Sequence, residues 1–451
     1  MRRTIIFLIL FFIIGHAQNA AAQPYLSAPT TLPNIRAEMK TPGFWISRLN
    51  APDEVVMTPE EIQKFNQDII TSKLRDEIAA FPENYSGKEL RDILKKRLNE
   101  IAAAGHFTQD GRKAKKEFFD IIEKNLDLEK IPDILTVKFA FVVRNADQRF
   151  LPTKEILTAK TLDIDFDELQ NSALDINTPV AVLWQSADRR WSYTIGPSSS
   201  GWVLTENLAL CSQDDIKKIH TSDFAVVTEA KADIYLDKER KQFYGFVRMG
   251  TRFEIKNFSA DVVEIALPLR DENGILKMAS GHVQTKNITR GYRPYTRRTI
   301  IEQAFEMLNT PYGWGGANGE QDCSQFLQEV FATVGVDIPR DSSSQAKTGI
   351  SLYDFNDKES EQIRAETVLT KAQAGVSLLY MQGHILLYLG SDGEIPYAIH
   401  DTWAYREKIN GKDTPIVINK VTVSDLSLGH NSNKGSLLKR LKSIRMLGLK
   451  K

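Results

Sequence analysis

The sequence predicts a multidomain α+β protein: a helical segment, then two small β-barrels, then a mixed α+β domain. Three observations lead to this prediction. The chain has 451 residues, which is too long for a single hydrophobic core. Helix-capping patterns gather in residues 23–134, and short apolar strands bounded by turn residues follow. Helical and strand patterns then occur together in residues 289–451.

The first 22 residues have the pattern of a secretory signal peptide. A short basic start, Met1-Arg2-Arg3, precedes an almost wholly apolar stretch from Thr4 to Gly15, and Ala20-Ala21-Ala22 offers a small-residue cleavage site. We therefore expect export to the periplasm or the cell-wall side, with cleavage near Ala22. The alternative is an uncleaved anchor. No later segment approaches the ~20 apolar residues that span a bilayer, so we expect no stable membrane anchor after cleavage.

Residues 23–134 form the predicted N-terminal helical domain. The stretch from 23 to 52 is rich in Pro and Thr without periodicity, and we expect it to lie extended. Thr58-Pro59-Glu60-Glu61 combines an N-cap, an N1 proline and a capping-box glutamate. Ser86-Gly87-Lys88-Glu89 is a second capping box, and a third helical pattern covers Lys113 to Leu126. No candidate catalytic group lies here, so we expect this part to pack against the domains that follow.

Two groups of short strands come next, in residues 135–215 and 216–288. The expected strands of the first group lie at 136–143, 179–184, 191–195 and 201–203, and those of the second at 224–228, 233–236, 243–248, 252–255 and 262–267. Several short strands in 70–80 residues are typical of a small β-barrel. A long insertion, residues 161–175, occurs only in the first group.

The last domain, residues 289–451, mixes helices and strands. We expect helices at 297–308 and after residue 323, and strands near 376–380, 384–389, 397–400, 416–423 and 444–449. The basic tail from 437 to 451 could touch an anionic wall or membrane, but we favour a solvated edge that carries the final strand.

Cys323 is the strongest candidate for chemistry. Apolar residues follow it on one helix face, at Phe326, Leu327, Val330, Phe331 and Val334. A thiol on the first turn of a helix lies near unpaired N–H groups and the positive end of the dipole, and we expect both to favour the thiolate. A thiolate at the start of a buried helix is a nucleophile of the kind that cysteine hydrolases use.

A base and an orienting group for Cys323 are available on two successive strands. His384 opens one strand and His400 ends the next. Adjacent antiparallel strands place such side chains side by side, so one imidazole can act as base while the other fixes its tautomer. A zinc site made of Cys323, His384 and His400 is the alternative. We expect Cys211 to be buried and unreactive. A Cys211–Cys323 disulfide would block the chemistry.

Four motifs follow one another in this last domain: Asn309-Thr310-Pro311-Tyr312-Gly313-Trp314-Gly315-Gly316, Asp322-Cys323-Ser324, Ile338-Pro339-Arg340-Asp341-Ser342-Ser343-Ser344-Gln345 and Gly383-His384-Ile385. The ordered set resembles the NlpC-type cell-wall cysteine endopeptidases, a papain-like family, over most of residues 292–451. The strands that carry Trp184, Trp191 and Gly201-Trp202-Val203 resemble bacterial SH3-like domains. The whole order is similar to one subgroup, with a helical clip, two SH3-like domains and a catalytic domain.

The resemblance implies hydrolysis of peptidoglycan stem peptides between γ-D-glutamyl and an L-diamino acid such as diaminopimelate, without a cofactor or metal. It implies Cys323 as nucleophile, His384 as general base and His400 as the orienting residue. Tyr312 matches a family tyrosine that helps to hold the oxyanion, and the Cys323 backbone N–H is a sensible second donor. The implied substrate-binding residues are Asp322, Ser324, Arg340, Ser342 and Trp314.

Two departures from the family pattern bear on pocket width and stem preference: Gln325 where many members have Gly, and Ile385-Leu386 where many have Val-Gly. For Arg340 and Ser342 the alternative role is a helix cap after Pro339. Two other functions remain open, a non-catalytic peptidoglycan-binding protein and an acyltransferase or amidase on the same fold. Lys plus Arg (58) equals Asp plus Glu (58), so bulk charge does not indicate nucleic acid. We expect murein stem peptides as partners, no nucleic acid, and a monomer.

Overall fold

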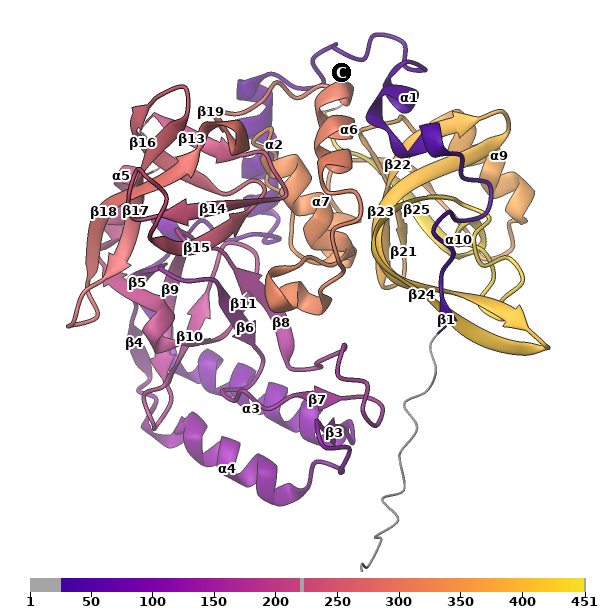
Figure 1. The fold of residues 1–451 in the computed structure, drawn as a ribbon. Helices are drawn as coiled ribbons and strands as arrows, with labels where there is room; N and C mark the ends of the chain where they lie inside the picture. Colours follow the sequence, from indigo (N-terminus) through magenta and orange to yellow (C-terminus); the bar gives the residue numbers. More distant parts are fainter. Residues whose placement is uncertain (1–25, 220–222, 450–451) are drawn as a thin grey trace, which may run out of the picture.

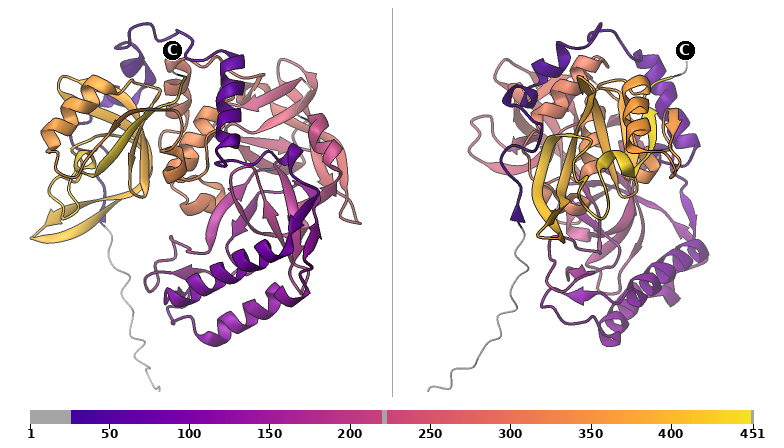
Figure 2. Two further views of the ribbon diagram at one scale, coloured as in Figure 1. Left: turned by 180° about the vertical axis from the view of Figure 1, so that it is seen from behind. Right: turned by 90° about the vertical axis from the view of Figure 1, so that its right-hand side faces the viewer.

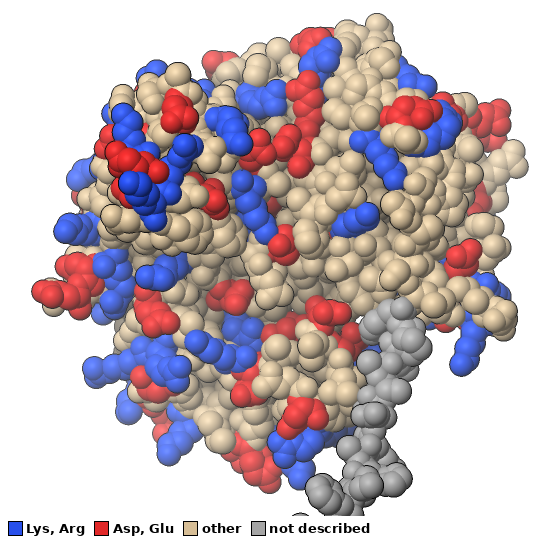
Figure 3. Space-filling model, in the orientation of Figure 1, with Lys and Arg blue, Asp and Glu red and all other residues tan. Residues whose placement is uncertain are grey.

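The computed structural model describes residues 26–219 and 223–449. The predicted signal peptide, residues 1–22, lies outside these ranges, so export and cleavage near Ala22 stay predictions. Over the described ranges, no helix has the length and apolar character needed to cross a bilayer. Basic and acidic side chains are interspersed over the face seen in Figure 3.

The predicted multidomain α+β fold is confirmed, and it is built around three seven-stranded sheets (Figure 1). The first sheet has the order β12-β5-β9-β10-β11-β6-β8. Its strands are β5 (Lys138–Val142), β6 (Ala146–Arg149), β8 (Gln170–Leu174), β9 (Pro179–Gln185), β10 (Trp191–Ile195), β11 (Ser200–Leu204) and β12 (Leu208–Cys211). The insertion between β6 and β8 is a long loop that carries only the short β7 (Leu157–Thr158).

The second sheet has the order β15-β14-β18-β17-β16-β13-β19. Its strands are β13 (Phe224–Val227), β14 (Lys231–Tyr235), β15 (Phe243–Arg248), β16 (Arg252–Phe258), β17 (Val262–Arg270), β18 (Leu276–Gln284) and β19 (Ile288–Arg290). The prediction of barrels is wrong in one respect. In the described strands of the first and second sheets, the two outermost strands do not pair with each other, so both sheets are open at that edge.

The third sheet belongs to the C-terminal domain and has the order β1-β24-β23-β22-β21-β25-β20. Its strands are β1 (Leu26–Ser27), β20 (Ile350–Asp354), β21 (Ser377–Met381), β22 (His384–Asp392), β23 (Ile395–Ile409), β24 (Lys412–Asp425) and β25 (Leu441–Met446). The helices of this domain are α6 (Arg297–Glu306), α7 (Cys323–Ala332), α8 (Ser342–Gln345), α9 (Glu361–Lys371) and α10 (Leu437–Arg440). Helices α6 and α7 lie between this sheet and the other two sheets (Figure 1).

The N-terminal helices are α1 (Pro42–Ile46), α2 (Pro59–Thr71), α3 (Gly87–Ala103) and α4 (Lys116–Leu126). Both predicted capped starts are present: Thr58 Oγ1 accepts the Glu61 N–H, and Ser86 Oγ accepts the Glu89 N–H. The extended conformation predicted for residues 23–52 is wrong in part. This stretch contains a 3-10 turn (Ala37–Lys40) and α1, because Met39 and Trp45 are buried in the C-terminal core.

The N-terminal part divides its packing between two cores. Residues 32–69 share a hydrophobic core with the third sheet, whereas α3 and α4 share one with the first sheet. The N-terminal strand β1 also adds to the edge of β24 in parallel. Figure 2 shows the result, with the indigo segment over the C-terminal domain and the purple helices under the first sheet. The segment links two domains, and the exact boundaries at residues 134, 215 and 288 stay predictions.

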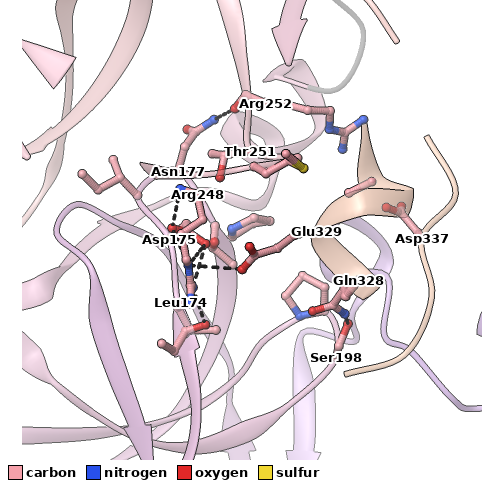
Figure 4. A pocket seen from close by; sticks show the side chains of 18 of the residues that line it. Leu174, Asp175, Asn177, Ser198, Arg248, Thr251, Arg252, Gln328, Glu329 and Asp337 are labelled. Atoms are coloured by element: carbon pink, nitrogen blue, oxygen red, sulfur yellow. Dashed lines mark hydrogen bonds and ion pairs between the residues drawn. The ribbon is translucent and has the colours of Figure 1, made fainter. Parts of the chain in front are cut away.

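The first and second sheets meet behind α7, around a cavity of about 230 Å³ (Figure 4). Arg248 of β15 is almost fully buried there. Its guanidinium donates to the Asp175 carboxylate at 2.8–3.2 Å, and to the backbone oxygens of Ala173 at 3.1 Å and Glu320 at 3.2 Å. The Glu329 carboxyl of α7 lies 3.5 Å from Arg248. These contacts fix α7, and with it Cys323, against the first and second sheets.

Candidate active site

Cys323 is the first residue of α7, as predicted. Asp322 is the N-cap, and its Oδ1 accepts the N–H groups of Ser324 at 3.2 Å and Gln325 at 3.0 Å. The apolar face that follows is fully buried, because Phe326, Leu327, Val330 and Phe331 belong to the C-terminal core. Cys323 itself is only 7% exposed. The cysteine is therefore held on a rigid helix start.

The two histidines are hydrogen-bonded to each other, and the predicted pairing of their strands is confirmed. Strands β22 and β23 are antiparallel, and His384 Nε2 lies 2.8 Å from His400 Nδ1. The backbone N–H of Ile385, the residue after His384, donates a hydrogen bond to the Cys323 sulfur. Because the bond to His400 occupies Nε2, Nδ1 is the nitrogen of His384 that is left for the thiol.

Ser424 extends this arrangement. Its hydroxyl lies 2.9 Å from His400 Nε2, and both side chains are buried. A hydrogen bond on each ring nitrogen fixes the orientation of the His400 imidazole. The sequence analysis missed Ser424 because a serine within an apolar strand has no local signal. The pairing of β24 with β23 brings it to the site.

Burial sets the protonation states of Cys323 and His384. It raises the pKa of the Cys323 thiol well above the usual range, the Asp322 charge adds to this, and the Ile385 N–H opposes it. Burial also lowers the pKa of His384, to about 3, with a smaller contribution from the Arg440 charge. The resting pair is therefore a neutral thiol and a neutral imidazole.

The expectation of a thiolate is thus wrong for this closed state. A helix N-terminus contributes roughly 0.3–1 kcal/mol to an anion, whereas full burial shifts a pKa by up to about 3–5 units. At Cys323 the larger effect prevails, and the carboxylate of Asp322 on the same helix start removes part of the dipole's benefit.

Tyr312 and Asp401 also border the cysteine. Burial raises the pKa of the Tyr312 phenol well above its usual value, and the nearby Cys323 and Asp322 add to this. The phenol therefore keeps its proton and can donate it in a hydrogen bond. Asp401 is fully buried, and burial followed by the Asp322 charge raises the pKa of its carboxyl well above normal. The sequence analysis did not include Asp401, although a charged residue in an apolar strand was a usable signal.

Three of the predicted substrate-binding residues are paired with one another. Arg340 makes a bidentate ion pair with Asp322 at 2.9 and 2.8 Å and donates to Ser324 Oγ at 3.1 Å. Its Nε donates to Ser172 Oγ of the first sheet at 3.0 Å. Burial opposes ionisation of Asp322, but Arg340, together with the hydrogen bonds from Gln325 and Ser324, holds the pKa of that carboxyl below its usual value. This network fixes α7 to the first sheet.

Ser342 is not brought into that network. It is the first residue of α8, where Asp341 acts as the N-cap by accepting the Ser344 N–H at 2.9 Å. The Ser342 hydroxyl makes no hydrogen bond to another described residue. Gln325, one of the two departures from the family pattern, is buried under Gly316 on the side of the first sheet. Its bulk therefore does not narrow the space around the cysteine.

Trp314 joins the site to the insertion of the first sheet. Its indole N–H donates to the Asp167 backbone oxygen at 3.2 Å. The Phe166 ring lies edge-on to both Trp314 and Trp403, at centroid distances of 5.3 and 5.0 Å. Gln170 Nε2 donates to the Gly315 oxygen at 3.3 Å. The insertion thus covers the β23–β24 end of the site.

The disulfide and zinc alternatives do not fit this geometry. Both cysteines are free thiols. Cys211 is half-buried rather than buried, and burial raises its pKa to about 12, which agrees with an unreactive residue. The facing nitrogens of His384 and His400 are 2.8 Å apart, which leaves no room for a metal ion between them. In residues 26–219 and 223–449, no cluster of three metal-ligating side chains occurs.

The fold and the site together define the class. A cysteine at the start of a buried helix, facing two histidines on adjacent strands of an antiparallel sheet, is the arrangement of a papain-like cysteine peptidase domain. Residues 309–411 match the model of the NlpC/P60 family, and residues 158–204 match that of the SH3 domain of SH3b1 type. The chain therefore contains an NlpC/P60 domain preceded by an SH3 domain.

Relatives and solved structures agree with these matches. The chain is similar to a γ-D-glutamyl-L-lysine dipeptidyl-peptidase of Bacillus cereus, with 25% identity over 46% of this chain and 57% of the relative. A protein of the same name from Bacillus subtilis is 28% identical over 33% of this chain and 46% of that relative. The chain thus spans about half the length of these relatives. An NlpC/P60 endopeptidase from Photobacterium damselae subsp. piscicida has the same fold, with a TM-score of 0.75, 18% identity, and coverage of 94% of this chain and 99% of that one.

Proposed function

We propose that this protein is a cysteine endopeptidase that hydrolyses peptidoglycan stem peptides at the bond between γ-D-glutamyl and an L-diamino acid. The observation that carries the proposal is that the Ile385 N–H, next to His384, bonds to the Cys323 sulfur, while His384 is hydrogen-bonded to His400. The similarity to peptidases named for the γ-D-glutamyl-L-lysine bond supports the choice of bond.

The proposed reaction follows the acyl-enzyme route. His384 Nδ1 takes the proton of the Cys323 thiol as the sulfur attacks the γ-carbonyl carbon of D-glutamate. The Cys323 backbone N–H and the Tyr312 hydroxyl are proposed to hold the oxyanion. His384 then gives the proton to the leaving amino group, and the C–N bond breaks. Water, deprotonated by His384, hydrolyses the thioester and restores the thiol. His400 and Ser424 keep the His384 ring in position.

The insertion of the first sheet is proposed to close the acyl end of the cleft. Phe166 lies between Trp314 and Trp403, and Asp167 and Gln170 bond to residues 314 and 315. Such a wall leaves room for only a short segment before the scissile bond, and therefore selects stem peptides with a free N-terminus. Four residues are proposed to support the substrate near this wall: Asp322, Ser324, Arg340 and Ser342. The first three would act together, because Arg340 bonds to Asp322 and Ser324.

This wall has its own test. Phe166→Ala is expected to allow cleavage of stems that still carry a muramyl group at the N-terminus, while Phe243→Ala, at an exposed position of the second sheet, is expected to leave the substrate range unchanged. If deleting the whole of residues 136–285 in a chain that still folds gives the wild-type substrate range, the wall has no role in selection.

The proposed location is the cell-wall side of an exported, monomeric protein. This rests on the signal-peptide pattern of residues 1–22 and on a substrate that lies outside the cytoplasm. N-terminal sequencing of the exported protein should begin at Gln23, and light scattering should give a mass close to that of one chain.

The main experiment is mass spectrometry of a defined tetrapeptide stem after incubation with the wild type and with Cys323→Ala. Hydrolysis by the wild type gives a dipeptide acid and a new free amine, and the variant should give neither. A new amide instead of a free acid would favour the acyltransferase alternative. No product from the wild type would favour the non-catalytic alternative, and equal products from both proteins would remove Cys323 from the mechanism.

A further inference from the structure

Arg440 differs from the buried arginines of the described chain. Arg149, Arg248 and Arg340 each pair with a carboxylate, and Arg364 donates to three backbone oxygens. Arg440 is partly buried, and the hydrogen bond recorded for its side chain goes from Nη2 to the Met381 sulfur at 2.8 Å. Its Nε is buried without an acceptor. A thioether is a weak acceptor, so this guanidinium is desolvated without an oxygen partner.

Arg440 reaches the face of the sheet that carries the catalytic base. Met381 of β21 lies directly opposite His384 of β22 in the antiparallel register, and opposite Leu441 of β25 on its other side. Directly paired residues present their side chains on the same face. The guanidinium that contacts Met381 therefore lies on the His384 face, and its charge contributes to lowering the pKa of both His384 and His400.

This position is at the end of the site opposite the Phe166 wall. The sheet order runs β24-β23-β22-β21-β25. Phe166 meets the site at Trp403 of β23, whereas Arg440 immediately precedes β25. If the wall holds the short acyl segment, the amino acid of the leaving group extends toward β21 and Arg440.

An unpaired, desolvated guanidinium next to a reacting centre fits an anionic group of the substrate. On the leaving-group side the two common diamino acids differ in one respect. Diaminopimelate carries a second carboxylate at the end of its side chain, and lysine has none. We propose that Arg440 binds this side-chain carboxylate and so makes the enzyme selective for stems that contain diaminopimelate over stems that contain lysine. This inference rests on the proposed function, because it names the substrate class of that same site.

The test compares three tetrapeptide stems, L-Ala-γ-D-Glu-X-D-Ala, in which X is meso-diaminopimelate, its side-chain amide, or L-lysine. Each is incubated with the wild type, Arg440→Met and Arg440→Lys. A hydrogen bond to a charged group contributes about 1.5–3 kcal/mol, so the wild type should have a kcat/KM for the diaminopimelate stem roughly 10- to 150-fold above that for the other two. Arg440→Met should lose this preference, with little change on the lysine stem. Arg440→Lys should keep part of it.

The matched control is Arg445→Met. Arg445 lies on β25, close to Arg440 in the chain, but it pairs with Asp354 of β20. Its removal should leave the preference intact.

Equal cleavage of the three stems by the wild type overturns the inference. So does an equal loss on all stems in Arg440→Met, which indicates that the residue acts on the histidines alone. Cleavage of no stem by the wild type would instead count against the proposed function. Binding of the three stems to Cys323→Ala, measured by calorimetry, then decides whether Arg440 distinguishes them.

Discussion

The front and the back of helix α7 both bury titratable side chains, with different consequences. At the front, Cys323 and His384 are enclosed as neutral groups, which the proposed mechanism uses for proton transfer. At the back, Glu329 is enclosed beside the ion pair of Arg248 and Asp175, which joins α7 to the first two sheets. The same physical effect, loss of water around an ionisable group, prepares chemistry on one side and joins domains on the other.

The first and second sheets also differ in which side of α7 they contact. The first sheet reaches both sides of α7, since its insertion covers the front at Trp314 while Ser172 and Asp175 bond to Arg340 and Arg248 at the back. The second sheet contacts the back, through Arg248 and through Gly250, which lies against Ala332. We infer that changes in the first sheet affect substrate choice, whereas changes in the second affect mainly assembly.

The largest expected effect concerns the protonation state of the front. Since burial raises the pKa of Cys323 above its usual value of about 8.5, no more than a few per cent of the thiol should be ionised at pH 7. The difference in absorbance at 240 nm between the wild type and Cys323→Ala should therefore stay flat from pH 5 to about pH 9. A step at acidic pH, as a preformed thiolate–imidazolium pair would give, would contradict the neutral resting state.

The second prediction concerns the back. Burial, opposed by Arg248 and reinforced by Asp175, raises the pKa of Glu329 to about 8. The folded state then binds a proton that the unfolded state has lost, so stability is full below the unfolded pKa and falls as pH rises to about 8. Between pH 6 and pH 9 the loss should be on the order of 3 kcal/mol. Denaturant unfolding at pH 6 and pH 9 measures it.

Glu329→Gln is the matched variant for this prediction. It keeps the size of the side chain and removes the titration, so its free energy of unfolding should change less between pH 6 and pH 9 than that of the wild type. An equal change in both proteins would mean that other groups cause the pH dependence. Activity per folded molecule should be unaffected.

The sequence predicts the front of α7 better than the back. The front follows local rules: Asp322 before Cys323 marks a helix start, and two histidines on successive strands predict a pair. The back depends on which domains meet. Nothing local in Glu329, Asp175 or Arg248 predicts that they converge, because they come from three separate sheets or helices and are brought together only by domain packing.

Strand length was the other weak point of the sequence analysis. The strand predicted at 397–400 is β23, Ile395–Ile409, and its partner is β24, Lys412–Asp425. The parts of these strands that the prediction missed, residues 402–409 and 412–415, are mostly half-buried and mix polar with apolar residues, so they lack the clear apolar alternation that the prediction used. The Asn410-Gly411 turn between them is a strong hairpin signal and would have revealed the extension. Arg440 was read as part of a solvated edge for a similar reason, since a basic tail gives no indication of which neighbour it will meet.

The third prediction tests the orienting role of His400. His400→Ala removes the partner of His384 Nε2, leaving the base free to rotate or to take the wrong tautomer. Loss of such a supporting group typically costs about 10- to 100-fold, and the effect should fall on kcat more than on KM. Stem-peptide hydrolysis and a thermal melt, measured side by side, separate this from unfolding. A change confined to KM would argue for substrate binding instead.

The smallest expected effect is at Ser424, the last member of the hydrogen-bonded series. Ser424→Ala removes one bond to His400 Nε2 but leaves the bond between the histidines, so His400 loses orientation only in part. A neutral hydrogen bond contributes about 0.5–1.5 kcal/mol, which corresponds to a decrease in kcat of roughly two- to tenfold. In the double variant with His400→Ala the effect should disappear, because Ser424 acts only through His400. Additive losses in the double variant would mean that Ser424 has a separate role, and the gradient from His384 to His400 to Ser424 would no longer describe the front of α7.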